Sequence, residues 1–324
     1  INANLFIFSS LLNLNELTTK DSLDSNSIRE NIHNLRLELA FKSTSSDLFN
    51  SPNLPAGDFF IKNFYGKLEH YPHTLRKFNA HFIIGDQDIE ILEFTGKIDK
   101  SEFLYTGVLD NYPILLEDTV KGSLDFDFGL KSNLLRLNDL FAYDGENYVP
   151  PDYRDEEISD LYMYGNAELE FRDSLISTVV YFDQLGADLK VHPMDLHDIH
   201  GKIQLKDDII RLEQLSGNIG NTSLTANMNL YLGDNDSIRK TTNLMALYAE
   251  VMDYDQLSNY AAKDKKDDAG LTPSDSVFNI YTLPFTDLKF ALNIDQFNYH
   301  GEMIENINAD LRIQKDHHLY VDTL

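Results

Sequence analysis

Apolar and polar residues alternate along most of this chain with a period of two. The stretch LRLELAF places Leu35, Leu37, Leu39 and Phe41 on one side and mostly charged residues on the other. The same alternation recurs in SLDFDFGL, AELEF, SLTANMNLYL and DLKFALNI. Successive side chains of an extended chain point to opposite faces, so each stretch predicts a strand with one apolar and one polar face.

Short polar turns separate these predicted strands. They read GDQD at residues 85–88, KDD at 206–208 and KDHH at 315–318, and they hold the Asp and Gly residues that tight turns favour. Consecutive hairpins of this kind predict an antiparallel meander. Helices are expected to be few, with at most a short one near Asp255–Ala261.

Two phrases recur along the chain at similar intervals. SSLLNLNEL, Ser9–Leu17, returns as SNLLRLNDL, Ser132–Leu140, with six of nine positions identical, and AEVMDYDQL at residues 249–257 keeps the same apolar, polar and acidic order. FIIGDQDIEILEFTG, residues 82–96, aligns without gaps on IQLKDDIIRLEQLSG, residues 203–217, and both end in a Gly that could mark a bulge or a bend before the next strand.

This spacing predicts repeat units of about 120 residues. Residues 1–27 end a preceding unit, residues 28–140 and 141–257 form two units, and residues 258–324 form part of a third. The chain begins and ends inside strand-like patterns, so we expect it to be a piece of a longer protein whose targeting or anchoring segment lies outside it.

Composition narrows the classes of function. The 324 residues carry a formal net charge of −26, with a pI near 4.5. Such a surface repels phosphate backbones and anionic membranes at long range, and no basic run offsets it, so no nucleic-acid partner is expected. Cysteine is absent, which excludes disulfides, thiolate metal sites and a cysteine nucleophile.

No catalytic motif stands out, and the chain is not expected to be an enzyme. The closest approach to a metal site is HPMDLHDIH, with His192, Asp195, His197, Asp198 and His200. Zinc needs three or four convergent ligands, and the corresponding HYPHTLRKF of the first unit keeps two histidines without the acids. We therefore expect a polar strand connection here, with no metal and no cofactor.

The apolar faces could be buried in two ways. A closed sandwich packs them against a second sheet, whereas an open curved sheet lines one continuous trough with them. The pattern of strands is the same in both arrangements, so the sequence leaves both open.

One family resemblance bears on this choice. The order LPFTDLKFALNIDQFNYHGEMIENINADLRI, continued in the second copy by an acidic turn and IIRLEQLSG, resembles the AsmA-like or TamB-type repeat, whose superfamily includes bridge-like lipid transfer proteins. SNLLRLNDL resembles the step that ends such units. The resemblance implies an all-β fold, an elongated, curved antiparallel meander sheet forming a groove, with few short helices.

The resemblance also implies a function. Such a chain would be a non-enzymatic periplasmic segment, anchored to the inner membrane through a segment not present here, whose apolar β-groove transfers phospholipid between inner and outer membrane in outer-membrane biogenesis. Its partners would be phospholipid acyl chains. The alternative is an envelope scaffold or assembly factor that binds other envelope proteins through its β-edges, without lipid transport.

The alternating strands supply the groove-lining candidates. They are Leu35, Leu37, Leu39, Leu124, Phe126, Phe128, Leu169, Phe171, Leu224, Met228, Leu230, Leu288, Phe290 and Leu292.

Overall fold

The chain folds almost entirely into strands. The computed structural model describes residues 1–14, 30–50, 54–116, 120–149, 151, 154–190, 194–257, 287–314 and 318–324. Within these residues every helix is short, and the longest is α4, Asp236–Thr242. None of the described helices has the length and apolar character needed to cross a membrane.

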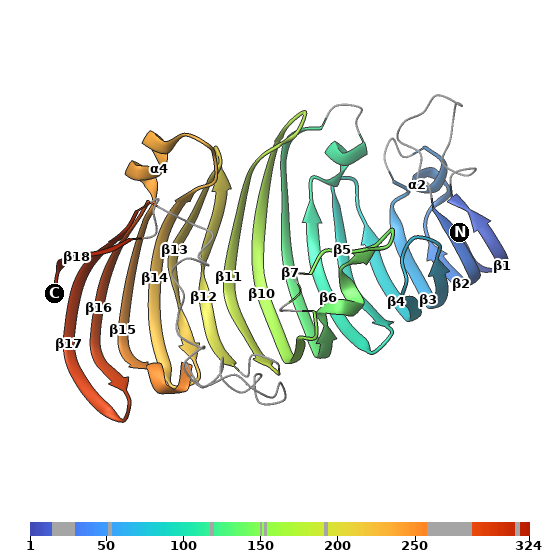
Figure 1. Ribbon diagram of the computed structural model, residues 1–324. Helices are drawn as coiled ribbons and strands as arrows, with labels where there is room; N and C mark the ends of the chain where they lie inside the picture. The colour runs from blue at the N-terminus through green and yellow to red at the C-terminus, as the bar shows by residue number, and fades with distance from the viewer. Residues whose placement is uncertain are drawn as a thin grey trace. The chain divides into compact units, whose positions relative to one another are not determined.

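Sixteen long strands form one sheet in which the spatial order follows the order along the chain (Figure 1). The strands are β1 (Asn2–Asn13), β2 (Asn31–Lys42), β3 (Gly57–Leu68), β4 (Thr74–Ile84), β5 (Asp88–Ile98), β6 (Ser101–Asp110), β7 (Lys121–Arg136), β10 (Glu157–Arg172), β11 (Leu175–Leu189), β12 (Asp195–Lys206), β13 (Ile209–Ile219), β14 (Thr222–Tyr231), β15 (Leu244–Asp253), β16 (Leu288–Tyr299), β17 (Glu302–Ile313) and β18 (Leu319–Thr323).

Residue contacts divide the chain into two compact units. Unit 1 comprises Ile1–Val120 and Leu124–Tyr162, and unit 2 comprises Lys121–Ser123 and Met163–Leu324. This division is distinct from the predicted repeats, whose boundaries stay a prediction.

Unit 1 carries a meander of antiparallel strand pairs from β1 to β7. Short elements lie in its connections: α2 (Ser45–Asn50), the 3-10 helix η1 (Tyr112–Leu116), α3 (Leu137–Leu140) and the two-stranded sheet of β8 (Ala142–Tyr143) with β9 (Glu146–Asn147).

Unit 2 continues the meander from β11 to β15, but β15 pairs with β16 in parallel. Leu244, at the start of β15, lies opposite Lys289, at the start of β16, so the connection returns the chain to the same end of the sheet. The prediction of antiparallel pairing throughout is wrong at this pair, because a parallel pair needs a crossover connection and not a hairpin. β17 and β18 are antiparallel again.

The predicted fold class is otherwise confirmed. The protein is all-β, with one open, curved and mainly antiparallel sheet and few short helices. Among the described residues the second sheet has only two strands, each of two residues. The residues that the structure describes therefore do not form a closed sandwich, which needs two sheets of comparable size.

The repeated phrase marks the place where a strand gives way to a helical turn. β1 ends at Asn13 before the helical Leu14, β7 ends at Arg136 before α3, and β15 ends at Asp253 before helical residues 254–257. The short helix expected near Asp255–Ala261 thus begins at Tyr254, and its residues after 257 lie outside the described part of the chain.

The repeated hairpins also fold alike. Residues 82–96 form the β4–β5 hairpin and residues 203–217 the β12–β13 hairpin. Asp207 and Asp208 both have a positive φ, of 51° and 58°, as a two-residue hairpin turn of the primed type requires. The third predicted turn, KDHH, lies mainly in residues 315–317, outside the described residues, although Ile313 and Leu319 pair across it.

The glycines that end the two phrases each face a β-bulge. The register of β4 with β5 shifts between Arg76 and Asn79, opposite Gly96, and that of β12 with β13 shifts between His197 and His200, opposite Gly217. A Cβ on Gly96 would stand 2.8 Å from the Phe78 ring. The predicted bulge is therefore present, but on the partner strand, and the glycine makes room for it.

Candidate functional site: an apolar face on each unit

Register pairing gathers apolar side chains of unit 1 onto one face of its sheet. Residues paired across neighbouring strands lie on the same face. One row runs through Leu5, Leu39, Ile61, Ala80, Phe94, Tyr105 and Leu130, and a second through Phe41, Phe59, Phe82, Ile91, Gly107 and Phe128. A third joins Ile84, Ile89, Leu109 and Phe126.

Aromatic rings pack side by side on this face. Ring centroids of the cluster Phe64, Phe78, Phe94 and Phe103 lie 5.3–5.9 Å apart. These separations suit the offset and edge-to-face contacts that aromatic rings prefer. Phe126 and Phe128 follow on β7, with centroids 5.8 Å apart. These lateral contacts cover part of each ring, and no second sheet among the described residues packs against the cluster.

Unit 2 has an apolar face of the same kind. One row runs through Val180, Ile203, Leu212, Met228, Met245, Phe290 and Leu311, without a polar residue from β11 to β17. The parallel pair continues this row, since Met245 lies opposite Phe290 and Leu247 opposite Leu292. The change of strand direction therefore leaves the apolar face unbroken.

The predicted groove-lining residues other than Leu169 and Phe171 of β10 lie on these faces, as the alternation along their strands places them. Unit 1 holds Leu35, Leu37, Leu39, Leu124, Phe126 and Phe128, and unit 2 holds Leu169, Phe171, Leu224, Met228, Leu230, Leu288, Phe290 and Leu292. Three of them, Leu35, Leu124 and Leu288, are at most 5% exposed and serve as core. The others are half-buried, so solvent reaches part of each side chain.

Sequence reasoning missed many members of the same rows. Ile61, Phe82 and Phe94 complete the rows of unit 1 from β3, β4 and β5. The signal was present, because these strands also alternate apolar with polar residues, but bulges shift the alternation within each strand and obscure it.

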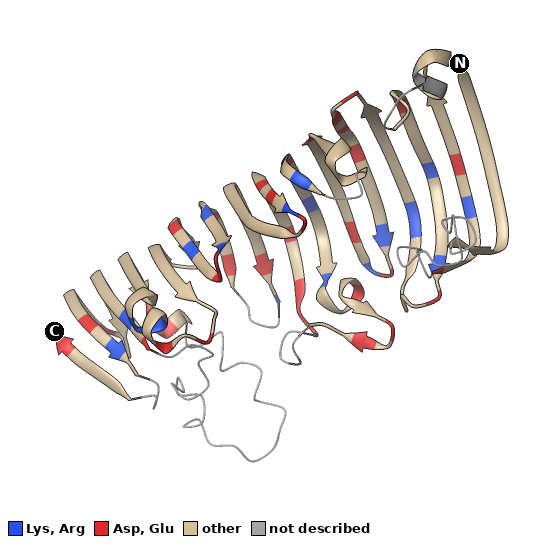
Figure 2. Ribbon diagram, turned by 90° about the horizontal axis from the view of Figure 1, so that it is seen from above, with Lys and Arg blue, Asp and Glu red and all other residues tan. Residues whose placement is uncertain are grey.

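Charged side chains occupy the opposite face. Lys62 lies opposite Glu38 across the β2–β3 pair and follows Ile61 of an apolar row. Figure 2 shows Lys and Arg on successive strands next to the N-terminal strand, and acidic residues on strands of both units. The sheet of each unit is thus two-sided, as the period-two pattern predicts.

The histidine-rich segment proposed as the closest approach to a metal site does not gather its ligands. His197 Nε2 lies 2.5 Å from Asp195 Oδ1, whereas His200 Nδ1 contacts the Asp198 carbonyl oxygen at 2.9 Å. His192 lies outside the described residues.

A different cluster brings three metal-ligating groups together in unit 1. One ligand atom each of His73, Asp99 and Asp139 lie within 4.8 Å of one another. Asp139 already accepts hydrogen bonds from Ser101 Oγ at 3.1 Å and Lys100 N at 3.3 Å. These bonds tie α3 to the β5–β6 turn and explain the cluster without an ion.

The hydrogen bonds and charges of this cluster shift the pKa values of Asp99 and of the neighbouring Tyr71. Burial alone would raise the pKa of Asp99, but hydrogen bonds from His73 at 2.7 Å and the Thr74 N–H at 3.1 Å outweigh it and lower the pKa. Burial, followed by the charges of Asp139 and Asp99, raises the pKa of Tyr71 to about 12. Tyr71 stays neutral and donates its hydroxyl to the Asp139 carbonyl oxygen.

Comparison of the chain with models of known families, with curated proteins and with solved structures finds no match.

Proposed function

We propose that the apolar sheet faces bind phospholipid acyl chains, and that the chain is a non-enzymatic segment of a lipid-transfer protein of the cell envelope. The observation that supports this is the unbroken apolar row of unit 2, which crosses seven strands without a covering sheet among the described residues. The family resemblance adds periplasmic localisation, an inner-membrane anchor outside this chain and a role in outer-membrane biogenesis to the proposal.

Energetics favour a continuous lining for this role. Moving an acyl chain of roughly 16 methylenes through water costs on the order of 13 kcal/mol, at about 0.8 kcal/mol per methylene. A passive carrier must therefore keep apolar contact along the path. The half-buried side chains of the rows can exchange water for lipid, whereas fully buried core residues cannot.

Lipid extraction tests the proposal directly. The purified chain is extracted with organic solvent and the extract is analysed by mass spectrometry, beside the variant Phe126→Asp/Met228→Asp, which places one carboxylate in the apolar face of each unit. We expect phospholipid with the parent chain and a several-fold loss with the variant, because each carboxylate must be desolvated under lipid.

A matched variant controls for the added charge. Thr106→Asp/Asn229→Asp places the same two carboxylates on the opposite face of β6 and β14, since Thr106 precedes Gly107 and Asn229 follows Met228 of the apolar rows. It should retain lipid. A parent chain free of lipid, or equal loss from both variants, would refute the proposal, and circular dichroism verifies that each variant keeps its strands.

One observation favours the alternative of a protein-binding scaffold. Among the described strands β1 pairs only with β2, and it exposes Phe6 and Phe8 at 63% and 71%. An edge strand with free N–H and C=O groups and exposed aromatic side chains can pair with a strand of a partner protein.

Substitutions distinguish the two candidate functions, lipid binding and protein binding. Phe6→Lys/Phe8→Lys on the edge strand should abolish capture of a partner protein, yet leave lipid content unchanged if the apolar faces carry the lipid. Loss of lipid with the edge variant and not with Phe126→Asp/Met228→Asp would favour the edge as the functional surface.

A further inference from the structure

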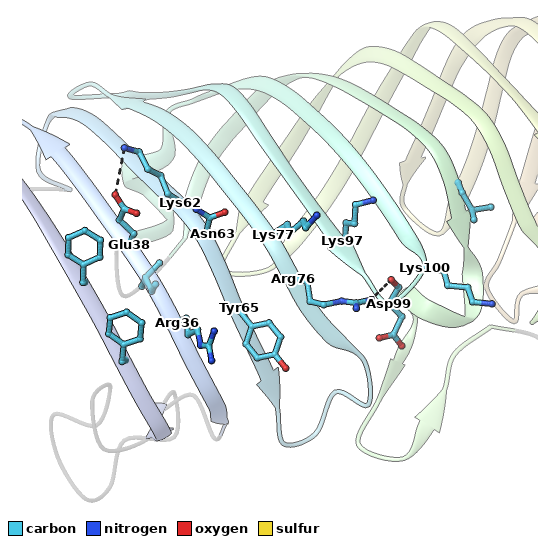
Figure 3. A pocket seen from close by; sticks show the side chains of 14 residues that line it. Arg36, Glu38, Lys62, Asn63, Tyr65, Arg76, Lys77, Lys97, Asp99 and Lys100 are labelled. Carbon is cyan, nitrogen blue, oxygen red and sulfur yellow. Dashed lines mark hydrogen bonds and ion pairs between the residues drawn. The ribbon is translucent and has the colours of Figure 1, made fainter.

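A pocket of about 920 Å³ in unit 1 concentrates positive charge in this acidic chain (Figure 3). Its cations are Arg36, Lys62, Arg76, Lys77, Lys97 and Lys100, and they face only two lining carboxylates, Glu38 and Asp99. Six of the 27 Lys and Arg residues of the chain therefore line one pocket, although the whole chain carries a net charge of −26.

The pocket lies on the polar side of the sheet. Arg76 lies opposite Lys97 across the β4–β5 pair, and Lys62 follows Ile61 of an apolar row. Figure 3 shows the labelled cations projecting from adjacent strands. The cations of the pocket thus project from the face opposite the apolar rows, although the groove-lining candidate Leu37 also lines the pocket.

The side chains of half of the cations make no hydrogen bond or ion pair within the described residues. Lys62 lies 3.9 Å from Glu38, Lys97 contacts Glu102, and Arg76 donates to the Asp99 carbonyl oxygen at 2.6 Å. These contacts hold three cations in place. No ion pair within the described residues involves the remaining three, which are Arg36, Lys77 and Lys100.

The repeat provides an internal comparison. Five of these cations have counterparts 121 residues further along, in the interval that relates the two hairpins. They are Asp183 for Lys62, His197 for Arg76, Asp198 for Lys77, Asn218 for Lys97 and Asn221 for Lys100. Lys77 and Asp198 share the same φ of 53°. The backbone is repeated while the charge is not, so folding does not require the cations.

We propose that this pocket binds an anion that carries two or more phosphate groups. Arg36 on β2 and Lys97 on β5 are three strand spacings apart, about 14 Å, which exceeds the span of a single phosphate. Guanidinium and ammonium groups donate charge-assisted hydrogen bonds to phosphate oxygens, with Arg binding in a bidentate manner. Phe6, Phe8 and Tyr65 also line the pocket and could contact an apolar part of the ligand.

Two probes distinguish a soluble ligand from a lipid headgroup. Sodium tripolyphosphate, titrated by calorimetry, represents a soluble polyphosphate. Flotation with phosphatidylcholine vesicles, with and without cardiolipin, represents a headgroup that carries two phosphodiesters. Binding of either probe supports the site, and the arm that responds identifies the source.

The test variant Arg36→Gln/Lys77→Asn/Lys100→Asn removes the three unpaired cations. Asn tolerates the left-handed backbone at position 77, and it stands in the second copy at the position of Lys100. We expect binding to weaken at least about tenfold, the loss expected for one charge-assisted hydrogen bond, with a smaller dependence on salt concentration.

A control variant removes three cations elsewhere. Lys121→Gln/Arg172→Gln/Lys206→Gln lies in unit 2, where each cation pairs with a carboxylate. It should change the affinity less than about twofold, because none of the three residues lines the pocket and each is already paired with a carboxylate. Absence of binding to both probes, or an equal loss in both variants, would overturn the proposal, whichever way the lipid extraction turns out.

Discussion

The backbone N–H of Arg136 donates a hydrogen bond to the hydroxyl of Ser101 at 2.9 Å. The same bond recurs in the second copy, where the N–H of Asp253 donates to the Thr222 hydroxyl at 3.1 Å. Ser101 and Thr222 are both 0% exposed. In each copy a buried hydroxyl at the start of one strand, β6 or β14, therefore binds the backbone at the end of the next strand, β7 or β15.

A second bond accompanies the first in each copy. The N–H of Lys100 donates to Asp139 Oδ2 at 3.3 Å, and the N–H of Asn221 donates to Gln256 Oε1 at 2.7 Å. In both copies a side chain of the helical turn thus caps the hairpin before it. The recurring phrase, SNLLRLNDL in the first copy and AEVMDYDQL in the second, supplies one partner of each of these hydrogen bonds.

Removing either hydroxyl should destabilise the fold. Ser101→Ala and Thr222→Val each leave a partly buried N–H without its acceptor, which costs up to about 1–3 kcal/mol. Urea unfolding followed by circular dichroism measures the effect. Thr222→Ser, which keeps the hydroxyl, should lose less than Thr222→Val, and the opposite order would show that the methyl group matters more than the hydrogen bond.

Glu30 should make unit 1 sensitive to acid. Burial would raise the pKa of Glu30, but hydrogen bonds from the N–H groups of His70, Glu69 and Asn31 and from the Tyr143 hydroxyl outweigh it and lower the pKa. A lowered pKa means that the carboxylate stabilises the fold above its unfolded value near 4.5 and loses that contribution as the pH falls through the folded value.

Glu30→Gln tests this prediction. We expect the variant to be less stable than the parent by about 1–3 kcal/mol at neutral pH, and the difference to shrink below about pH 4.5. Thermal unfolding across this pH range measures it, with the exposed Glu93→Gln as the control for net charge. A difference that does not change with pH would rule out the charged form of Glu30 as the cause.

The bulge opposite Gly96 should not tolerate a larger residue. Gly96→Ala brings a Cβ to 2.8 Å from the Phe78 ring, and such overpacking typically costs about 1–3 kcal/mol. Phe78→Leu creates room, so the double variant should lose less stability than the sum of the single variants. Additive losses in urea unfolding would place the strain elsewhere.

Asn243 should hold the start of the parallel strand pair. It is 2% exposed, its side-chain oxygen accepts the N–H of Tyr231 at 2.8 Å, and its carbonyl oxygen accepts the N–H of Lys289 at 3.2 Å. Asn243→Ala removes the first bond, and we expect about 1–3 kcal/mol of destabilisation with faster amide exchange at Tyr231 and Lys289. Asn229→Ala is the control, and unchanged exchange in Asn243→Ala would refute this role.

Much of the fold could be predicted from the sequence because its determinants are local. The acidic turn at Asp207–Asp208 and the alternation in DLKFALNI depend only on neighbouring residues, and both features are present. The candidates Phe126 and Met228 also lie on the predicted apolar faces. Their role in lipid binding stays a prediction.

Other features depend on contacts distant in the sequence. The parallel pairing of Leu244 with Lys289 is set by a connection of more than thirty residues that carries no strand pattern. The basic pocket escapes a search for basic runs because its residues come from positions 36 to 100 on separate strands. Aligning the two copies shows that five of its cations have no Lys or Arg counterpart at the equivalent positions of the second copy.

The bulge shared by Lys77 and Asp198 has a consequence for how such a chain can change. The two residues have the same backbone conformation and carry opposite charges. Because both side chains are exposed at a bulge and neither belongs to an apolar row, selection can change their charge without disturbing the fold. Duplication thus gives this protein positions where new binding specificity can evolve in one copy while the other keeps its original residues.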